Sequence, residues 1–423
     1  MLFHIHTKFD WDVIKYRKHA VYDVLPATVC RPERSRIMQI TLCRWGSAME
    51  KGVKRGLNAL GISCSDFRRE ISDYDTDRAY MDALSEHLLA NRDSDLVMSV
   101  NYIPVVAMVC KAHKIPYISW VVDCPCLTLY SSTVSYPTNF IFLFDRQQHA
   151  KFEAENPGHI FHLPLAFDPA VARDLSLSDA DRKKYGCDIS FVGALYKKRC
   201  QYDKVAGKLP DYIRGYVEGL IASQKNVFGY NLLADSIDEK WAYEFMKYAD
   251  FHVLDNYRKD YREFIADYFI GYKCTQEERI GIMRAVSGLG KTCLFTTDDT
   301  KEFPEINNCG IADTFAVMPK VFALSRINLN ITLRSISSGI PLRCFDIMGA
   351  GGFLLSNYQP ELSEHFIGGE ELVMYSSMSD LLDKVSYYLE HEDERRAIAA
   401  AGQKKVLEEF TFEHQLKNMF EML

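Results

Sequence analysis

The chain has 423 residues, of which 48% are hydrophobic and 25% charged, and these proportions are typical of folded globular proteins. Its length exceeds what one ordinary hydrophobic core serves, so we expect two or three domains. The net charge of −7 argues against a general nucleic-acid-binding protein, which would carry a basic balance.

The twelve cysteines show no paired spacing that would indicate disulfides. Cys124 and Cys126 are too close together for a zinc knuckle, so we expect a reducing, cytoplasmic setting and no metal. The first 20 residues carry charges throughout, unlike a signal peptide. The most apolar stretch, residues 97–110, falls well short of the about 20 residues that a membrane span needs. We therefore expect no transmembrane segment.

Strand-like and helix-like runs alternate through the first part of the chain. The expected strands cover residues 36–46, 95–101, 116–123, 140–145 and 160–168, and the expected helices 47–61 and 103–113, the first capped by Ser47. Apolar strands with helices between them indicate a parallel sheet covered on both faces. Ligands of such sheets bind at the carboxyl ends of the strands. Candidate residues there are Arg44, Trp45, Gly46, Ser47, Asn101, Tyr102, Asp123 and Asp145.

A second series of strands follows a polar, Asp-rich linker at residues 171–187. We therefore predict a Rossmann-like domain over residues 1–170, with an extension of unknown role at 1–35, and a second one over 188–400. Residues 200–288 form a helical, aromatic-rich insertion in the second domain. Residues 401–423 are expected to be helical, and the oligomeric state stays open.

The stretch Gly339–Gly352 contains a helix whose start is well suited to an anion. Pro341 suits the beginning of a helix, whose first N–H groups are unpaired and whose dipole is positive there. Gly339 permits a close backbone approach, and Arg343 adds a cation. Asp346, one turn inside, could accept hydrogen bonds from both hydroxyls of a ribose. The alternative is that Asp346 only pairs with Arg343, three residues earlier.

The sequence "SGIPLRCFDIMGAGGFLLSNYQPELSEHFIGGEELVMYSSMSDLLDKVSYYLEH" resembles the C-terminal domain of group 1 glycosyltransferases, in particular the spore-maturation CgeB-like family. The segments "PYISWVVDCPCLTLY", "FIFLFDR" and "DISFVGALYKKRCQYDKV" are similar to earlier parts of the same proteins. The resemblance implies a GT-B fold, in which two Rossmann-like domains face each other. It further implies that the second domain holds a nucleotide sugar and the first an acceptor.

The family pattern has two acids separated by seven residues, of which the second binds the nucleotide ribose. Asp346 falls in the second position, whereas Ser338 occupies the first, where the family contacts the donor sugar. Basic residues after the first strand of the second domain would neutralise the diphosphate. The resemblance assigns this role to Gly193, Lys197, Lys198 and Arg199. Gly339 and Arg343 join the donor side from the helix start, and Asn330 and Arg334 from the strand end just before it. Lys197 and Arg343 are the candidate catalytic cations.

The resemblance places the acceptor against the first domain. Asp123 lies where many relatives carry a His or Asp that faces the acceptor, and as a general base it would need to approach the hydroxyl within about 3 Å. It could equally cap the turn before Pro125. Arg44, Trp45, Ser47 and Asn101 would line the same side. Trp45 could stack on a sugar or simply pack in the domain.

The sequence thus predicts a cytoplasmic, metal-independent glycosyltransferase of hexosyltransferase type, acting in bacterial glycan or glycoprotein modification. Its donor would be a nucleotide-diphosphate sugar, with UDP favoured, and its acceptor a protein, glycan or small molecule. Retention of configuration is implied by analogy alone. Two alternatives stay open: a GT-B binding or assembly protein without catalysis, favoured by the missing acid at Ser338, and a nucleotide-sugar epimerase on the same frame.

Overall fold

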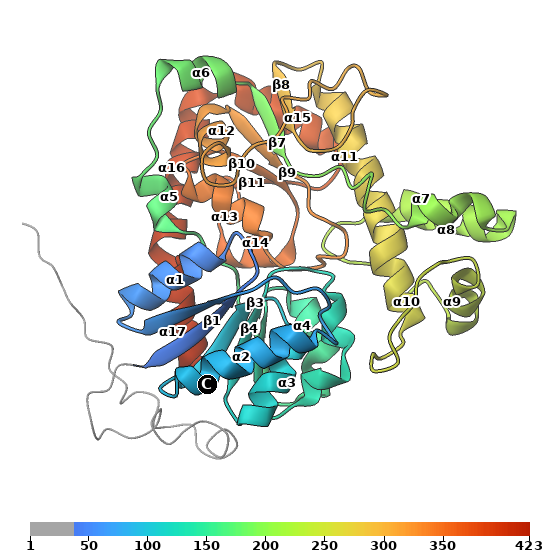
Figure 1. Ribbon diagram of the computed structural model, residues 1–423. Coiled ribbons are helices and arrows are strands. Elements are labelled where there is room, and N and C mark those ends of the chain that lie inside the picture. Colours follow the sequence, from blue (N-terminus) through green and yellow to red (C-terminus); the bar gives the residue numbers. More distant parts are fainter. Residues whose placement is uncertain (1–37) are drawn as a thin grey trace, which may run out of the picture.

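The computed structural model describes residues 38–423, so the predicted extension over residues 1–35 lies outside the described part. The described chain folds into two α/β domains, each built on one parallel sheet with helices on both faces (Figure 1). This confirms the predicted fold class. The domains lie one above the other in the figure, and the carboxyl ends of both sheets point toward the junction between them.

The first sheet has six parallel strands in the order β2-β1-β3-β4-β5-β6. Its strands are β1 (Gln39–Arg44), β2 (Ser63–Arg68), β3 (Leu96–Val100), β4 (Tyr117–Val121), β5 (Asn139–Leu143) and β6 (Ile160–His162). The three strands β3, β4 and β5 are buried along their whole length, as continuous apolar runs predict. The edge strand β2 was not predicted, because its sequence, SCSDFR, is mostly polar.

The second sheet has five parallel strands in the order β11-β10-β9-β7-β8. These are β7 (Ile189–Val192), β8 (Thr292–Phe295), β9 (Ile327–Asn330), β10 (Leu354–Asn357) and β11 (Val373–Tyr375). Strand β7 pairs with both β8 and β9, so the two strands that flank the insertion are neighbours in the sheet. A long helical insertion between them therefore leaves the sheet continuous.

Helices cover both sheets. In the first domain they are α1 (Glu50–Ala59), α2 (Arg78–Ala90), α3 (Pro104–His113) and α4 (Arg146–Phe152). The link between domains holds α5 (Pro169–Arg173) and α6 (Asp179–Tyr185). The second domain adds α12 (Met318–Leu324), α13 (Leu342–Gly349), α14 (Pro360–His365), α15 (Met378–Glu390) and α16 (Glu392–Glu409).

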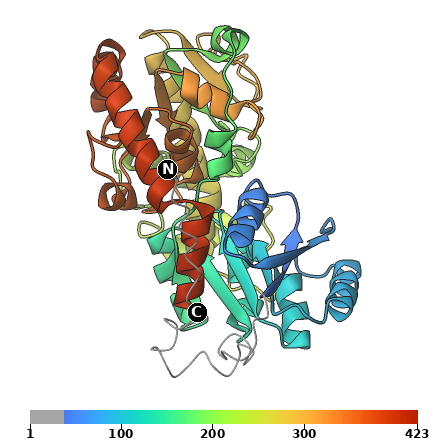
Figure 2. The same ribbon diagram turned by 90° about the vertical axis from the view of Figure 1, so that its left-hand side faces the viewer.

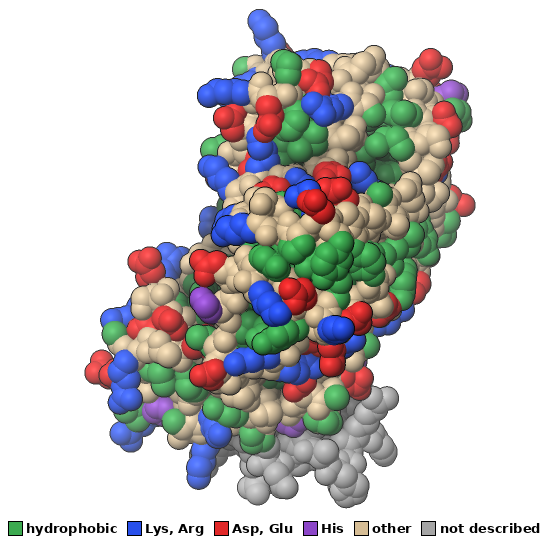
Figure 3. Space-filling view, turned by 90° about the vertical axis from the view of Figure 1, so that its right-hand side faces the viewer, with side chains coloured by type: hydrophobic (Ala, Val, Ile, Leu, Met, Phe, Trp, Pro, Cys, Tyr) green, Lys and Arg blue, Asp and Glu red, His purple; other side chains and the backbone are tan. Residues whose placement is uncertain are grey.

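The insertion between β7 and β8 projects from the second domain, on the right of Figure 1. It contains α7 (Tyr202–Val205), α8 (Asp211–Gln224), α9 (Glu239–Met246), α10 (Tyr261–Phe264), a π-helical segment (Ile265–Gly271) and α11 (Tyr272–Val286). It has a hydrophobic cluster of its own, yet Phe264 belongs to the core of the first domain. The insertion therefore contacts both domains. Figure 3 looks onto this side and shows hydrophobic side chains in a band across the middle of that face.

The last helix, α17 (Phe412–Met422), returns to the first domain and packs against α1 (Figure 2). Phe412 lies edge-on to Trp120 of β4, with ring centroids 5.8 Å apart. A Cβ at Gly52 would lie 2.1 Å from the Phe412 ring, and one at Gly56 2.7 Å from Leu416. The two glycines of α1 therefore make the groove that receives α17.

Candidate functional site

Asp346 and Arg343 lie on the first two turns of α13, at the junction of the two domains. An Nη1 atom of Arg343 donates to Oδ2 of Asp346 at 3.0 Å, so the pairing considered from the sequence is present. Both side chains are about one quarter exposed (25% and 26%), which leaves them accessible to a ligand. Enclosure by protein raises the pKa of Asp346, and the charge of Arg343 opposes that rise.

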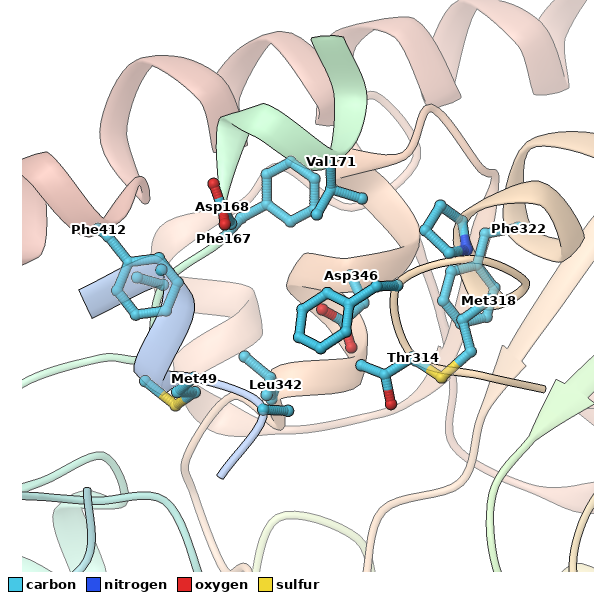
Figure 4. A pocket seen from close by; sticks show the side chains of 15 residues that line it. Met49, Phe167, Asp168, Val171, Thr314, Met318, Phe322, Leu342, Asp346 and Phe412 are labelled. Carbon is cyan, nitrogen blue, oxygen red and sulfur yellow. The ribbon is translucent and has the colours of Figure 1, made fainter. Parts of the chain in front are cut away.

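Figure 4 shows Asp346 at the wall of a mainly apolar pocket that both domains line. The pocket holds about 50 Å³ and is bounded by Met49, Phe167, Val171, Met318, Phe322, Leu342 and Phe412, among others. A carboxylate set in such surroundings interacts strongly with any hydroxyl group placed beside it, because little water competes. Asp346 is therefore suited to hold a polar ligand group at an apolar surface.

The turn before α13 is filled by a carboxylate of the first domain. The backbone N–H groups of Ser337, Ser338 and Gly339 donate to Oδ2 of Asp145 at 2.8, 2.8 and 2.9 Å. A Cβ at Gly339 would lie 2.8 Å from the Asp145 Cα atom and the Phe144 carbonyl oxygen. Such a run of N–H groups is an anion site, and here the anion is Asp145. The phosphate contact assigned to Gly339 stays a prediction.

Unpaired N–H groups are found slightly further along the chain. Helix α13 has no side-chain cap at Pro341, and the backbone N–H groups of Leu342 and Arg343 have no hydrogen-bond partner among the described residues. The helix dipole makes this end positive. The anion-binding position open in this structure is therefore the first turn of α13.

Ser338 contacts an acid that the sequence analysis did not single out. Its hydroxyl donates to Oε1 of Glu361 at 2.8 Å, and Nε2 of His162 lies 2.8 Å from Oε2 of the same carboxylate. The backbone N–H of Arg146 also donates to Glu361. Burial alone would raise the pKa of Glu361, but these hydrogen bonds and the nearby imidazole lower it below its usual value. Its position after Pro360 at the start of α14 gave no signal for this contact.

Of the basic residues after β7, only Arg199 faces the first domain. Lys197 Nζ pairs with Glu302 and donates to the Asp299 carbonyl oxygen at 2.9 Å. Lys198 is exposed, and its charge reaches Asp299 on the same side. Arg199 is exposed and acts electrostatically on Asp123 across the domain junction. The backbone N–H of Gly193 donates to the Phe295 carbonyl oxygen. A Cβ added at Gly193 would lie 3.0 Å from the Phe191 ring.

Two predicted donor residues are buried in the second domain instead. Arg334 makes a two-pronged ion pair with Glu278, at 2.9 and 2.7 Å, and donates to the Val227 carbonyl oxygen. The side-chain amide of Asn330 donates to the hydroxyls of Thr332 and Ser356. The structure thus uses both side chains to join strands and helices of the core, and neither contacts Asp346 among the described residues.

Asp123 and Asn101 lie together at the ends of β4 and β3. The Asn101 amide donates to Oδ2 of Asp123 at 2.7 Å and accepts from the Val122 N–H at 2.8 Å, with Asn101 held at φ 63°. Asp123 is open to the junction, yet protein on both sides desolvates it, which raises its pKa. Asn101 and Arg199 partly offset that rise. Asn101 therefore orients the candidate base.

The loop after β1 is organised by Glu50. Its Oε1 atom accepts from the N–H groups of Trp45, Gly46 and Ser47 at 2.8, 2.8 and 3.0 Å, while Oε2 pairs with Arg44. This folded-back carboxylate explains why α1 begins at Glu50 rather than after a Ser47 cap. The backbone donors and Arg44 are thus already occupied.

Trp45 forms part of the wall of a large cavity beside this loop. Its indole N–H donates to the Val100 carbonyl oxygen at 2.7 Å, which fixes a ring that is 37% exposed. The cavity holds about 760 Å³, and its lining includes Ser47, Arg68, Arg69, Tyr74, Asp313 and Phe315. The predicted acceptor side thus borders open space between the domains.

No group of three or more His, Cys, Asp or Glu side chains suited to a metal occurs among residues 38–423. Within the same range, no helix combines the length and the apolar character needed to cross a membrane.

Comparison with known proteins supports the architecture. Residues 307–421, which contain α13, match a family described as "Glycosyl transferase-like". No curated protein is significantly similar to the chain in sequence. The structure of Anabaena HepE in complex with UDP-glucose superposes with a TM-score of 0.50 at 10% identity, over 90% of this chain and 98% of that one. A sucrose-phosphate synthase from Thermosynechococcus elongatus gives 0.47 at 10% identity, over 90% and 97%. The superposition with HepE thus supports the predicted GT-B fold, and residues 307–421 form the region that matches the glycosyl transferase-like family.

Proposed function

We propose that the protein transfers a sugar from a nucleoside-diphosphate donor to a hydroxyl group of an acceptor. The observation that carries this proposal is the position of Asp346 and Arg343 at the start of α13, within the glycosyl transferase-like region. Asp123 and Asn101 of the first domain lie at the same domain junction, where Arg199 reaches Asp123. In this proposal the helix start binds the diphosphate, Asp346 binds the ribose and Asp123 acts as the base.

Each part of the donor has a partner in this arrangement. The diphosphate would lie at the N–H groups of Leu342 and Arg343, with the Arg343 and Arg199 guanidinium groups neutralising its charge as it leaves. The Asp346 carboxylate would accept both ribose hydroxyls, exchanging its contact with Arg343 for them. Since the similar HepE structures contain UDP or UDP-glucose, UDP sugars are the first donors to test.

Asp123 would take the proton from the acceptor hydroxyl. A general base works best with a pKa near the working pH, and enclosure in the junction moves the Asp123 pKa upward in that direction. Metal-independent transfer, retention of configuration, hexosyl transfer, the CgeB-like subfamily and a cytoplasmic location are parts of the same proposal.

Binding of nucleotides to the full chain tests the site. Thermal shift and calorimetric titration with UDP-, GDP- and dTDP-sugars should reveal one preferred nucleotide. Asp346→Asn should weaken its binding about tenfold or more, since hydrogen bonds to charged groups contribute about 1.5–3 kcal/mol. The matched control is Asp383→Asn, an exposed change on α15. Equal affinity in wild type and Asp346→Asn would overturn the assignment.

A binding protein without turnover is the second candidate. It is favoured by the occupation of the Ser337–Gly339 turn by Asp145, together with the serine at position 338. The two candidates differ in donor hydrolysis. Slow release of UDP from a bound UDP sugar would support the transferase, whereas tight binding with no release over hours would support the binding protein.

A further inference from the structure

A third pocket lies between the first domain and the insertion, beside the loop that follows Asp123. It holds about 180 Å³. Pockets for drug-sized ligands measure about 300–1,000 Å³, so this one suits a single ring. Three parts of the chain line it: the loop Cys124–Cys126 with α4, the insertion, and Ser335 and Ser337 before α13.

The polar groups of this pocket are mostly acceptors. Gln148 is only 6% exposed, and its Oε1 atom has no hydrogen-bond partner among the described residues. The Nε2 atom of the same side chain donates to the Asp123 carbonyl oxygen at 3.4 Å. An unpaired buried carbonyl is costly, so a ligand donor at this atom would be favourable.

Carboxylates add to the acceptor character. Asp267 and Glu263 share the Lys151 ammonium at 3.4 and 3.0 Å, and the Tyr130 hydroxyl donates to Glu263 at 2.8 Å. Asp235, which accepts from Tyr230, also lines the pocket. The lining contains three acids and one lysine, and Arg258 pairs with Glu263 at 3.5 Å. The acids still outnumber these cations, a balance that disfavours phosphate or carboxylate groups.

The backbone around Asp267 is itself unusual. Residues Ile265–Gly271 form a π-helical segment, a conformation that is rare and often found at functional sites. Ile265, Ala266, Phe269 and Ile270 fill the core of the insertion, while Asp267 lines the pocket. The wider turn therefore lets an acid reach the pocket without disturbing the insertion core.

We infer that this pocket binds one sugar ring, neutral or carrying an amino group, through its hydroxyl or ammonium donors. Gln148 and Asp267 would be the main acceptors. Cys124, which lines the pocket, directly follows Asp123, so the pocket adjoins the backbone of the candidate base. The identification of this ring as part of the acceptor rests on the proposed function. The binding of a sugar ring in the pocket does not.

Titration of the full chain with glucose, galactose, N-acetylglucosamine, glucosamine and glucose 6-phosphate, without nucleotide, tests the inference. At least one unphosphorylated sugar should bind saturably, and glucose 6-phosphate about tenfold more weakly or not at all. Asp267→Asn should weaken binding about tenfold, the change in affinity expected for one hydrogen bond to a charged group. Ala234→Phe, which fills the pocket from the insertion side, should abolish it.

Asp255→Asn is the matched control, because Asp255 lies on the same insertion and is fully exposed. It should bind sugars as the wild type does, and thermal unfolding shows whether each variant is folded. The inference is overturned if no sugar binds saturably, if glucose 6-phosphate binds equally well, or if folded Ala234→Phe binds like wild type. UDP titration of the wild type separates the two proposals: UDP binding without sugar binding refutes only the pocket, and sugar binding without UDP binding refutes only the donor site.

Discussion

Two backbone turns of this protein each present three consecutive N–H groups to a carboxylate, but they differ in where that carboxylate comes from. At Trp45–Ser47 the acceptor is Glu50, the first residue of the helix that follows the loop. At Ser337–Gly339 it is Asp145, from the other domain. The first turn is thus complete within one domain, whereas the second is complete only when the domains are closed. The same local motif shapes a loop in one place and joins two domains in the other.

Loss of the interdomain carboxylate, Asp145, should lower the stability of the protein more than any other change considered. Asp145→Ala removes the acceptor of four backbone N–H groups, including that of Gln148, at a position that is 1% exposed. We expect the free energy of unfolding to fall by about 3–4 kcal/mol, because buried donors are left unpaired. Urea denaturation measures this, and small-angle scattering should show a larger radius of gyration. An unchanged radius would show that other contacts hold the domains closed.

Loss of the local carboxylate should cost less. Glu50→Ala leaves the donors of Trp45–Ser47 next to a water-accessible cavity, and Arg44 keeps its ion pair with Asp66. The expected loss is about 2 kcal/mol, with no change in the radius of gyration. The exposed neighbour Glu70, changed to Ala, serves as control. Domain opening in Glu50→Ala would mean that this loop, too, helps to hold the domains together.

The pH dependence of stability sharpens the comparison, because a second buried carboxylate, Glu361, supports the interdomain turn. Its pKa is lowered in the folded state, so its contribution is complete above the unfolded value of 4.5 and is lost as the pH falls through the lower folded value. The free energy of unfolding of the wild type should exceed that of Glu361→Gln by about 2 kcal/mol near neutral pH. The gap should narrow below pH 4.5, as urea titrations over a pH series would show. A gap that stays constant would contradict the lowered pKa.

The smallest effect is expected for a charge pair that supports neither turn. Lys197 pairs with Glu302, whose side chain is mostly exposed, so Lys197→Ala should change stability by about 0.5 kcal/mol or less. Because the Lys197 ammonium is already held by Glu302 and the Asp299 carbonyl oxygen, nucleotide affinity should also be retained. A marked loss of UDP binding would instead support the catalytic role that the sequence predicts for Lys197.

Much of the fold could be predicted from the sequence, because the central strands are apolar runs and the second domain resembles a known family. The contacts that individual side chains make were harder to predict. Arg334 follows a strand end that should face the ligand, yet Glu278 of α11 holds it in the core. No spacing in the sequence connects Asp145 with Gly339, since that contact depends on the arrangement of two domains. Asp346, by contrast, could be proposed as a site residue because its helix carries the motif within one short segment.

The groove made by Gly52 and Gly56 has a consequence for how the chain is made. The core of the first domain includes Phe412 and Leu416, which emerge from the ribosome only after the entire second domain. Until then the apolar groove of α1 is left uncovered and available to chaperones or to other nascent chains. We therefore expect the first domain to reach its final packing late, after the polypeptide that separates it from its own last helix has folded.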